Sequence, residues 1–124
     1  MDRLEHLLAI QRQLNDTIKE KRGLQNIQPM EWMQKYTLAM LSELAEMLDE
    51  VNFKWWKNPK EIDSAALKEE LVDILHFFLS MCLAAGLDAE EMYRIYCEKN
   101  AENVARQEGR SAKPGYDPSQ LHQS

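Results

Sequence analysis

Four stretches of the sequence repeat apolar residues at the spacing of an α-helix, and this repetition constrains the fold more than any other feature. The first stripe consists of Leu4, Leu7, Leu8, Leu14 and Ile18. The 124 residues include only four Gly and four Pro, and Val is sparse beside Leu, Met, Ala, Glu and Lys. This composition favours helices over a sheet. The sequence therefore predicts an all-α, four-helix-bundle-like fold with helices over about 2–21, 29–51, 64–85 and 89–107.

Residues that end or cap helices separate these stretches. Gly23 and Gly86 are expected to stop the first and third helices. Asp63 or Ser64 is a candidate cap for the third helix, and Asp88 is one for the fourth. The aromatic-rich segment between the second and third helices breaks the pattern. We predict one domain over 1–107 and a mobile tail, rich in Gly, Ser, Pro and Gln, over 108–124.

Charge and cysteine content narrow the classes of function. The formal net charge of −6 argues against binding of a nucleic-acid polymer, which draws on a basic surface. Cys82 and Cys97 are the two cysteines, and neither belongs to a CxxC motif. A disulfide framework and a zinc site are therefore not expected, and a cytoplasmic location is the default.

The longest apolar run could be taken for a membrane-spanning helix, but its length and its polar residues argue against this. Residues 71–87 are interrupted by Asp73 and His76 and are few for a membrane span. The N-terminus carries charges where a signal peptide needs an apolar stretch. We therefore expect no membrane association and interpret the run as a buried central helix.

Two pairs of carboxylates stand in positions that helix packing does not require. Glu43 and Glu46 lie three residues apart on the second helix, and Glu70 and Asp73 lie three apart on the third. Residues at this spacing share a helix face, and these pairs border apolar stripes. Four converging carboxylates must take up protons or hold cations. All-oxygen ligands favour Mg²⁺, with Mn²⁺ close behind, whereas the alternative is a pair of solvated helix faces.

Two amides lie on the apolar stripe of the first helix. Gln11 and Asn15 are one turn apart, and a buried amide costs free energy unless it finds hydrogen-bond partners. One interpretation is a structural hydrogen bond inside the core. The other is a pair of amides that reads the donor and acceptor edge of a flat ligand such as a pyrimidine.

Cationic and aromatic residues supply further candidates. On the fourth helix one face carries Lys99, Asn103 and Arg106. These residue types commonly bind phosphate. Alternatively, they form a solvated last turn in which cations are favoured by the helix dipole. Segment 53–57 combines aromatic and basic residues. The aromatic rings either close the end of the helical bundle or stack on a nucleotide base. His76 either contacts a sugar hydroxyl or has a structural role.

Together these residues resemble a known pattern. Glu43-x-x-Glu46 followed by Glu70-x-x-Asp73 resembles the metal motif of the all-α NTP pyrophosphatase superfamily, which includes the MazG-type enzymes. Within it the sequence is most similar to the dimeric dUTPases. The supporting segments are Gln11-Arg12-Gln13-Leu14-Asn15, Phe53-Lys54-Trp55-Trp56-Lys57, Asp73-Ile74-Leu75-His76-Phe77 and Lys99-Asn100-x-x-Asn103-x-x-Arg106-Gln107.

The resemblance implies a role for each candidate residue. Mg²⁺ ions bridging a triphosphate would be held by Glu43, Glu46, Glu70 and Asp73. A deoxyuridine nucleotide would contact Gln11, Asn15 and Trp56 through uracil, His76 and Phe77 through the sugar, and Lys57, Lys99, Asn103 and Arg106 through phosphate. The family forms homodimers and converts dUTP to dUMP and pyrophosphate.

Three functions remain open on the sequence. The first is a Mg²⁺-dependent dUTP diphosphatase, in which we assign Glu46 as the catalytic base that takes a proton from water. The second is a house-cleaning NTP pyrophosphatase of broader specificity. The third is a non-catalytic helical adaptor whose carboxylates are solvated.

Overall fold

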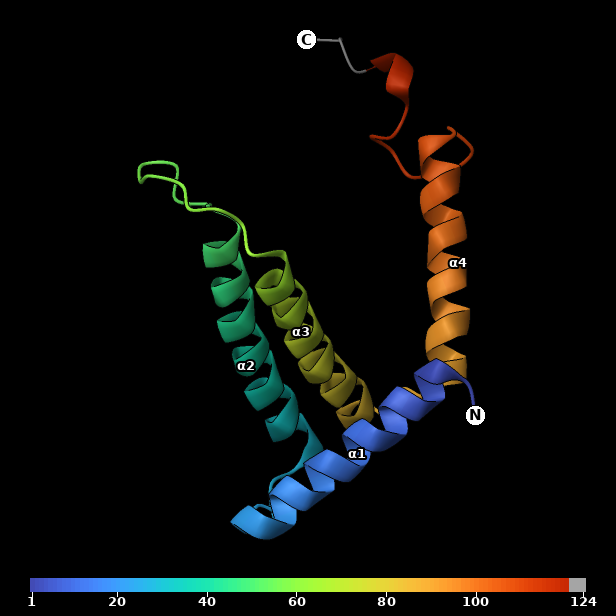
Figure 1. Cartoon of the computed structure of the whole chain (residues 1–124). Helices are drawn as coiled ribbons and strands as arrows, with labels where there is room; N and C mark the ends of the chain where they lie inside the picture. Colours follow the sequence, from blue (N-terminus) through green and yellow to red (C-terminus); the bar gives the residue numbers. More distant parts are fainter. Residues whose placement is uncertain (121–124) are drawn as a thin grey trace. The chain divides into compact units, whose positions relative to one another are not determined.

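The computed structural model describes residues 1–120 and consists of helices, with no strand in that range (Figure 1). The chain forms two compact units, Met1–Asp88 and Ala89–Ser124. The first unit contains α1 (Arg3–Arg22), α2 (Pro29–Glu50) and α3 (Ser64–Ala84). The second contains α4 (Ala89–Gln107) and the short 3₁₀ turn η1 (Pro118–Gln120). The predicted all-α fold and its four helices are confirmed. The domain boundary expected at residue 107 stays a prediction.

The helices begin and end for local reasons that the sequence carries. Asp63 caps α3, because its Oδ1 accepts a hydrogen bond from the amide of Ala66 at 3.1 Å. Gly23 follows α1 with φ of 66°, a left-handed conformation that glycine adopts without a Cβ clash. The next amide, that of Leu24, then donates to the Lys19 carbonyl at 2.8 Å and closes a Schellman turn. Gly86 ends α3 in the same way.

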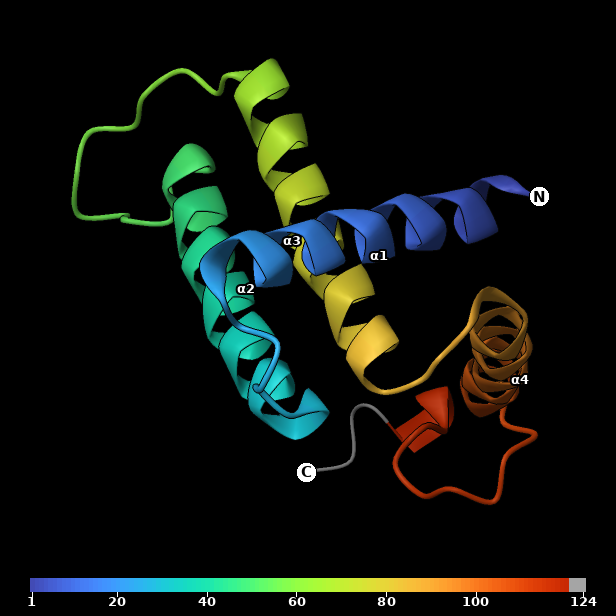
Figure 2. The ribbon, with the colours of Figure 1, turned by 90° about the horizontal axis from the view of Figure 1, so that it is seen from below.

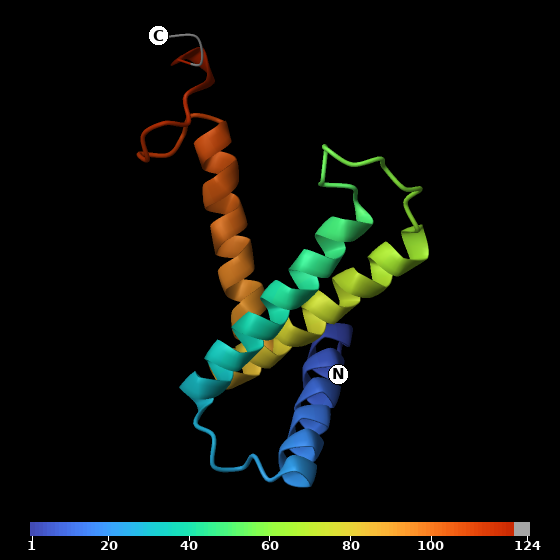
Figure 3. The ribbon, with the colours of Figure 1, turned by 90° about the vertical axis from the view of Figure 1, so that its left-hand side faces the viewer.

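The first unit is a helical hairpin crossed by a third helix. The chain runs along α2, turns through residues 51–63 and returns along α3, so that the two helices lie side by side in opposite directions (Figures 1 and 3). α1 crosses this pair and packs against α3 (Figure 2). Consequently α3 contacts both other helices, and side chains from all three can meet along it.

The expected burial of α3 is only partly correct. Its C-terminal half contributes the buried Leu79, Ser80 and Cys82. Its N-terminal half and middle leave large apolar side chains exposed by 39–52%, namely Leu71, Val72, Leu75 and Phe78. The interpretation of the apolar run 71–87 as a buried central helix therefore holds for only part of α3, because two contacting helices cover only part of its circumference. Among residues 1–120 no single helix is long and apolar enough to cross a membrane, although α3 and α4 meet that test when combined.

The second unit holds part of the predicted tail against α4. Glu102 accepts hydrogen bonds from Arg106 at 3.1 Å and from the Ser111 hydroxyl at 2.7 Å. The Arg106 guanidinium lies 5.5 Å from the ring centroid of Tyr116. Residues 111 and 116 thus contact the last turns of α4. Residues 121–124 of the predicted tail lie outside the described part of the chain.

Candidate functional site

Three carboxylates from two helices meet on the α2–α3 seam. Glu43 and Glu46 project from α2 and Glu70 from α3, and each has a carboxylate oxygen within 4.8 Å of the others. The two helices bring them together because α2 and α3 lie side by side in opposite directions (Figures 1 and 3). At such separations two carboxylates repel by about 4 kcal/mol at an effective dielectric near ~20. The cluster must therefore share protons or hold a cation.

Two buried oxygens and one raised pKa characterise the electrostatics of the cluster. The Oε2 atoms of Glu43 and Glu70 are buried and have no hydrogen-bond partner in the described part of the chain. Hydrogen bonding to Glu70, followed by burial and then by the charge of Glu46, raises the pKa of Glu43 from 4.5 to about 7. Protonation of Glu43 relieves the repulsion, and a divalent cation would do the same by engaging the orphaned oxygens.

Asp73, the fourth predicted ligand, does not join this group. It lies one turn after Glu70 on α3, its side chain is exposed, and it is not among the carboxylates whose oxygens lie within 4.8 Å of one another. An aspartate is one methylene shorter than a glutamate, so the same helix face carries its carboxylate less far. Its role as a ligand stays a prediction.

A mainly apolar cavity of about 480 Å³ opens between α1, α2 and α3. Four of the residues predicted to bind substrate line it together: Gln11, Asn15, His76 and Phe77. Residues far apart in sequence therefore converge as expected. Phe77 and the α1 residues Leu14 and Ile18 provide apolar walls, and the amides provide hydrogen-bonding groups. This combination suits a flat, polar-edged ring.

The polar groups of the cavity form a continuous chain of hydrogen bonds. His76 Nδ1 lies 2.5 Å from Gln11 Oε1, and Gln11 Nε2 donates to Asn15 Oδ1 at 3.0 Å. Asn15 Nδ2 donates to the Ser80 hydroxyl oxygen at 3.1 Å, and that hydroxyl donates to the His76 carbonyl at 2.8 Å. We call these four residues the amide relay. Gln11, Asn15 and Ser80 are exposed by only 5%, 8% and 2%, so this part of the relay is dry, whereas His76 at its end is exposed.

The sequence analysis missed the aromatic wall of this cavity. Trp32 and Tyr36 stack at a centroid distance of 5.2 Å with an interplanar angle of 23°, and both line the cavity. Lys19 Nζ lies 5.1 Å from the Trp32 ring centroid. A Trp and a Tyr one helical turn apart are typical of core packing, and for that reason they were not identified. Ser80, a small residue within a helix, gave no signal either.

The loop between α2 and α3 places Trp56 and Lys57 elsewhere. Neither lines the amide-relay cavity, and Trp56 is 64% exposed, with its ring perpendicular to that of Trp55 at a centroid distance of 4.7 Å. Lys57 lines a separate cavity of about 350 Å³ within the loop. The structure thus does not bring the predicted base-stacking Trp56 to the amides in a single chain.

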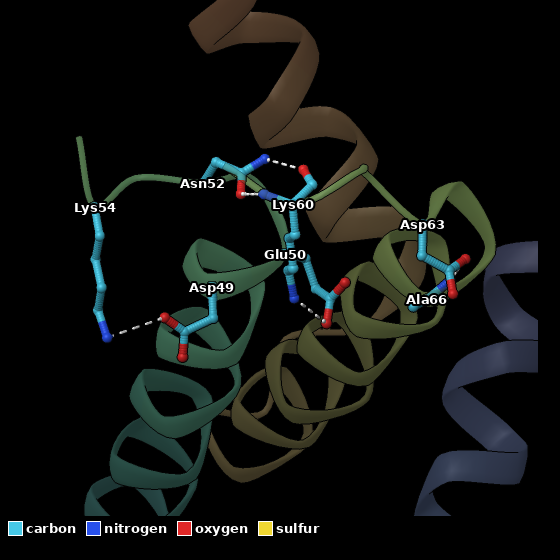
Figure 4. A network of polar contacts seen from close by, with 7 residues as sticks. All are labelled: Asp49, Glu50, Asn52, Lys54, Lys60, Asp63 and Ala66. Carbon is cyan, nitrogen blue, oxygen red and sulfur yellow. Dashed lines mark hydrogen bonds and ion pairs between the residues drawn. The ribbon is translucent and has the colours of Figure 1, made fainter. Parts of the chain in front are cut away.

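A side-chain clamp holds the base of this loop together (Figure 4). Asn52 donates through Nδ2 to the Lys60 carbonyl at 2.8 Å and accepts from the Lys60 amide at 2.9 Å. Asn52 has φ of 57°, a left-handed conformation that asparagine tolerates better than most residues. Two long ion pairs flank the clamp, Lys54 with Asp49 at 3.8 Å and Lys60 with Glu50 at 3.7 Å.

The three predicted phosphate ligands of α4 belong to the second unit. Lys99 and Asn103 are exposed to solvent, and Arg106 is half-buried. Arg106 donates to Glu102 and, through a terminal nitrogen, to Asn103 Oδ1 at 3.3 Å. Within this unit the three residues lie along one face of α4. Their relation to a nucleotide stays a prediction.

Comparison with known proteins identifies the family to which the sequence belongs. The sequence matches the family described as dUTPase over residues 3–88, a range that includes the three carboxylates and the whole amide relay. The chain belongs to this family. No solved structure matches the chain significantly.

Individual relatives come from bacteriophages. The chain is 48% identical over 46 residues to a dCTP pyrophosphatase of Enterobacteria phage LZ5, covering 37% of this chain and 27% of that protein. It is 35% identical over 77 residues to a dCTP pyrophosphatase of Enterobacteria phage T4, covering 62% and 38%. A DNA replication protein of Enterobacteria phage T4 is 35% identical over 69 residues, covering 56% and 14%. The chain thus spans well under half the length of these relatives.

Proposed function

We propose that this member of the dUTPase family is a Mg²⁺-dependent nucleoside triphosphate pyrophosphohydrolase that converts dUTP and water to dUMP and pyrophosphate. The observation that carries the proposal is the Glu43, Glu46 and Glu70 cluster with its orphaned buried oxygens, on the same seam as the amide-lined cavity. A helical adaptor would have no reason to bury carboxylate oxygens without partners, because each costs free energy.

The spacing between cluster and cavity supports a nucleotide as ligand. Ala39 of α2 lines the cavity, and Glu43 follows it by one turn, about 6 Å along the helix. On α3, Glu70 precedes the cavity residue Phe77 by two turns, about 10 Å. Both spacings keep the residues on one helix face. A base in the cavity and phosphates at the cluster would leave room for a pentose between them.

The carboxylates fit magnesium by the chemistry of their donors. Buried oxygen ligands without nitrogen or sulfur suit Mg²⁺, and Mn²⁺ is the second choice. We assign Glu43, Glu46 and Glu70 as ligands, and Asp73 as a further one on the family resemblance. When bound, the ions would neutralise phosphate charge and acidify a water molecule.

The residues of this chain then have distinct tasks. Glu46 is exposed, so its carboxylate is open to solvent, and we propose that it takes the proton of the attacking water. The amides of Gln11 and Asn15 would read the base. His76 and Phe77 would lie against the deoxyribose, and Trp56 would approach the base from the loop. Phosphate oxygens would be held by Lys57, Lys99, Asn103 and Arg106.

The printed names of the phage relatives favour a second candidate substrate. Two of them are dCTP pyrophosphatases, so dCTP is the alternative to dUTP. Uracil and cytosine differ at the edge that paired amides would contact: uracil offers a donor at N3, and cytosine offers an acceptor there. The reaction and the metal requirement are the same for both.

Turnover of a nucleotide panel tests the proposal. Purified protein is assayed with dUTP, dCTP, dTTP, UTP and dUDP in the presence of Mg²⁺, with and without a chelator. We expect chelator-sensitive release of pyrophosphate and a monophosphate, with dUTP preferred. Preference for dCTP would move the substrate to the second candidate, and equal rates would indicate a broad house-cleaning enzyme. Absence of turnover would contradict the proposal.

A homodimer forms the second part of the proposal. Leu71, Leu75 and Phe78 share one face of α3 and are exposed by 49%, 39% and 43%. A second copy of the chain is the occupant that the family resemblance favours for this apolar face. Sedimentation equilibrium should give twice the mass of the chain, and Leu75→Lys should lower it. The free Cys82 and Cys97 fit the reducing cytoplasm that we propose as its location.

A further inference from the structure

The amide relay has a fixed direction, and Ser80 sets it. The Ser80 hydroxyl oxygen lies 2.8 Å from the carbonyl oxygen of His76, one helical turn earlier. Two oxygens this close repel unless a hydrogen lies between them, so the single hydroxyl proton of Ser80 is committed to that carbonyl. The hydroxyl can then only accept a hydrogen bond from Asn15. Thr17 and Thr37 of this chain make the same bond to the carbonyl four residues earlier.

This constraint passes along the relay from residue to residue. Because Ser80 accepts, Asn15 must turn its Nδ2 toward it and its Oδ1 toward Gln11. Gln11 must then donate through Nε2 to Asn15 and turn its Oε1 toward His76. His76 must therefore carry a hydrogen on Nδ1, which leaves Nε2 as the acceptor of the neutral ring.

Without Ser80 the opposite direction would be equally well bonded. Asn15 could donate to Gln11, and Gln11 could donate to an unprotonated Nδ1 of His76, with the hydrogen on Nε2. An amide that rotates by 180° exchanges its donor for its acceptor at almost no cost in shape. The two directions present different patterns of donors and acceptors from the same side chains. Nothing else in the relay distinguishes them, because its other members are two amides and an imidazole.

We propose that Ser80 is a positioning residue that determines base specificity by fixing the orientation of the Gln11 and Asn15 amides and the tautomer of His76. This inference rests on the proposed function, since it assumes that the cavity receives a base. Ser80 is 2% exposed and lines the cavity beside both amides. A pocket that must separate uracil from cytosine needs amides that do not rotate.

The tautomer of His76 gives a test that needs no substrate. Protein labelled with ¹⁵N-histidine is examined by long-range proton–nitrogen correlation at about pH 8, where an ordinary imidazole is neutral. The signals of His76 are separated from those of His6 and His122 by their loss in His76→Gln. We expect Nδ1 to be protonated in the wild-type protein. A wild-type His76 protonated on Nε2 overturns the proposal, whether or not any variant folds.

Variants at two positions of α3 separate orientation from packing. Ser80→Ala should give a mixture of both tautomers, and Ser80→Thr should keep the wild-type one. Cys82→Ala is the matched control, because it also removes one buried side-chain atom, Sγ, from α3, two residues away and outside the relay. Circular dichroism verifies that each variant is folded. An unchanged tautomer in folded Ser80→Ala, or an equal change in Cys82→Ala, contradicts the proposal.

Specificity is measured on the same variants. In Ser80→Ala the ratio of kcat/KM between dUTP and dCTP should move toward one by about tenfold, the worth of one hydrogen bond. Ser80→Thr and Cys82→Ala should keep the wild-type ratio. A changed tautomer with an unchanged ratio overturns the link to specificity. If the wild-type protein hydrolyses neither nucleotide, the proposed function fails. The tautomer of His76 still tests whether Ser80 fixes the direction of the relay.

Discussion

Two polar clusters with buried atoms lie along α3, and they differ in how their hydrogen bonds are satisfied. In the amide relay, Gln11, Asn15, Ser80 and His76 bond to one another from end to end. In the carboxylate cluster, Glu43 and Glu70 each keep a buried oxygen without a partner. The relay is therefore complete in the single chain. The carboxylate cluster is complete only when protons or cations are added.

This difference separates two ways of preparing a site. A completed network holds its groups in one orientation and stabilises the fold, which suits recognition of a base. An incomplete cluster stores unfavourable electrostatic free energy that ligand binding releases, which suits a metal and a triphosphate. Breaking the relay should cost stability, whereas breaking the cluster should cost activity. Substitutions at each cluster test that contrast.

The largest effect is expected at the carboxylate cluster. Glu70→Gln keeps the size of the side chain but removes a charged metal ligand. We expect kcat/KM for the preferred nucleotide to fall by about a thousandfold, because several kcal/mol of charge stabilisation are lost. The free energy of unfolding without metal should not decrease, since a repulsive charge is removed. Glu69→Gln, at an exposed neighbouring position, is the control. Full activity in Glu70→Gln would exclude Glu70 as a ligand.

The amide relay should show the opposite balance. Asn15→Ala removes the acceptor of Gln11 Nε2 and the donor to the Ser80 hydroxyl oxygen in a dry environment, while both residues keep their contacts with His76. We expect the free energy of unfolding to fall by about 1–3 kcal/mol, measured by urea titration. Gln13→Ala on the exposed side of α1 should change it by less than about 0.5 kcal/mol. Equal stability of the two variants would mean that the relay contributes nothing to the fold.

Acidity offers a milder way to probe the cluster. The pKa of Glu43 is raised to about 7 in the native state, above its ordinary 4.5, so between these values the native state binds more protons than the unfolded one. Stability without metal should therefore fall as pH rises from about 4.5 to about 7. Thermal unfolding at several pH values measures this fall, and Glu43→Gln should reduce it. Saturating Mg²⁺ should also remove it. A stability that rises over this range in Glu43→Gln and wild type alike would contradict the assignment.

The smallest effect is expected in the exposed loop between α2 and α3, which belongs neither to the amide relay nor to the carboxylate cluster. Asn52→Gly removes both hydrogen bonds to Lys60 and keeps a residue that adopts positive φ readily. We expect a loss of at most about 1 kcal/mol in unfolding free energy but faster chymotrypsin cleavage near Trp55 and Trp56. Lys54→Ala breaks only an exposed ion pair and should leave both readouts unchanged. Equal cleavage rates in Asn52→Gly and wild type would show that the clamp does not order the loop.

The sequence was informative where local rules decide the structure. Helix ends at Gly23 and Gly86 follow from backbone preferences and were predicted correctly, and of the two candidate caps for α3, Asp63 and Ser64, Asp63 is the one that caps it. Four carboxylates at i and i+3 on two helices were expected to converge; Glu43, Glu46 and Glu70 do, whereas Asp73 does not join them. Amides on an apolar stripe were expected to find partners, and Gln11 and Asn15 do.

The sequence was less informative where the structure depends on the packing of segments that are distant in the chain. Trp32 and Tyr36 form the wall of the cavity only because α2 lies beside α1 there, and their spacing alone indicates a core. Trp56 was expected to contact the base; in the single chain its side chain is 64% exposed, in a loop that the Asn52–Lys60 clamp closes, and its contact with a base stays a prediction. Ser80 acquires its importance from Asn15, 65 residues earlier in the chain.

Magnesium uptake measured by calorimetry tests the central claim most directly. The protein is titrated with Mg²⁺ near pH 7 in the presence of a non-hydrolysable dUTP analogue, in two buffers of different ionisation enthalpy. We expect saturable binding with release of a proton from Glu43, and loss of both signals when Glu43 and Glu70 are changed to Gln. Absence of Mg²⁺ binding, or equal binding by that double variant, would contradict the claim that these buried carboxylates form a metal site.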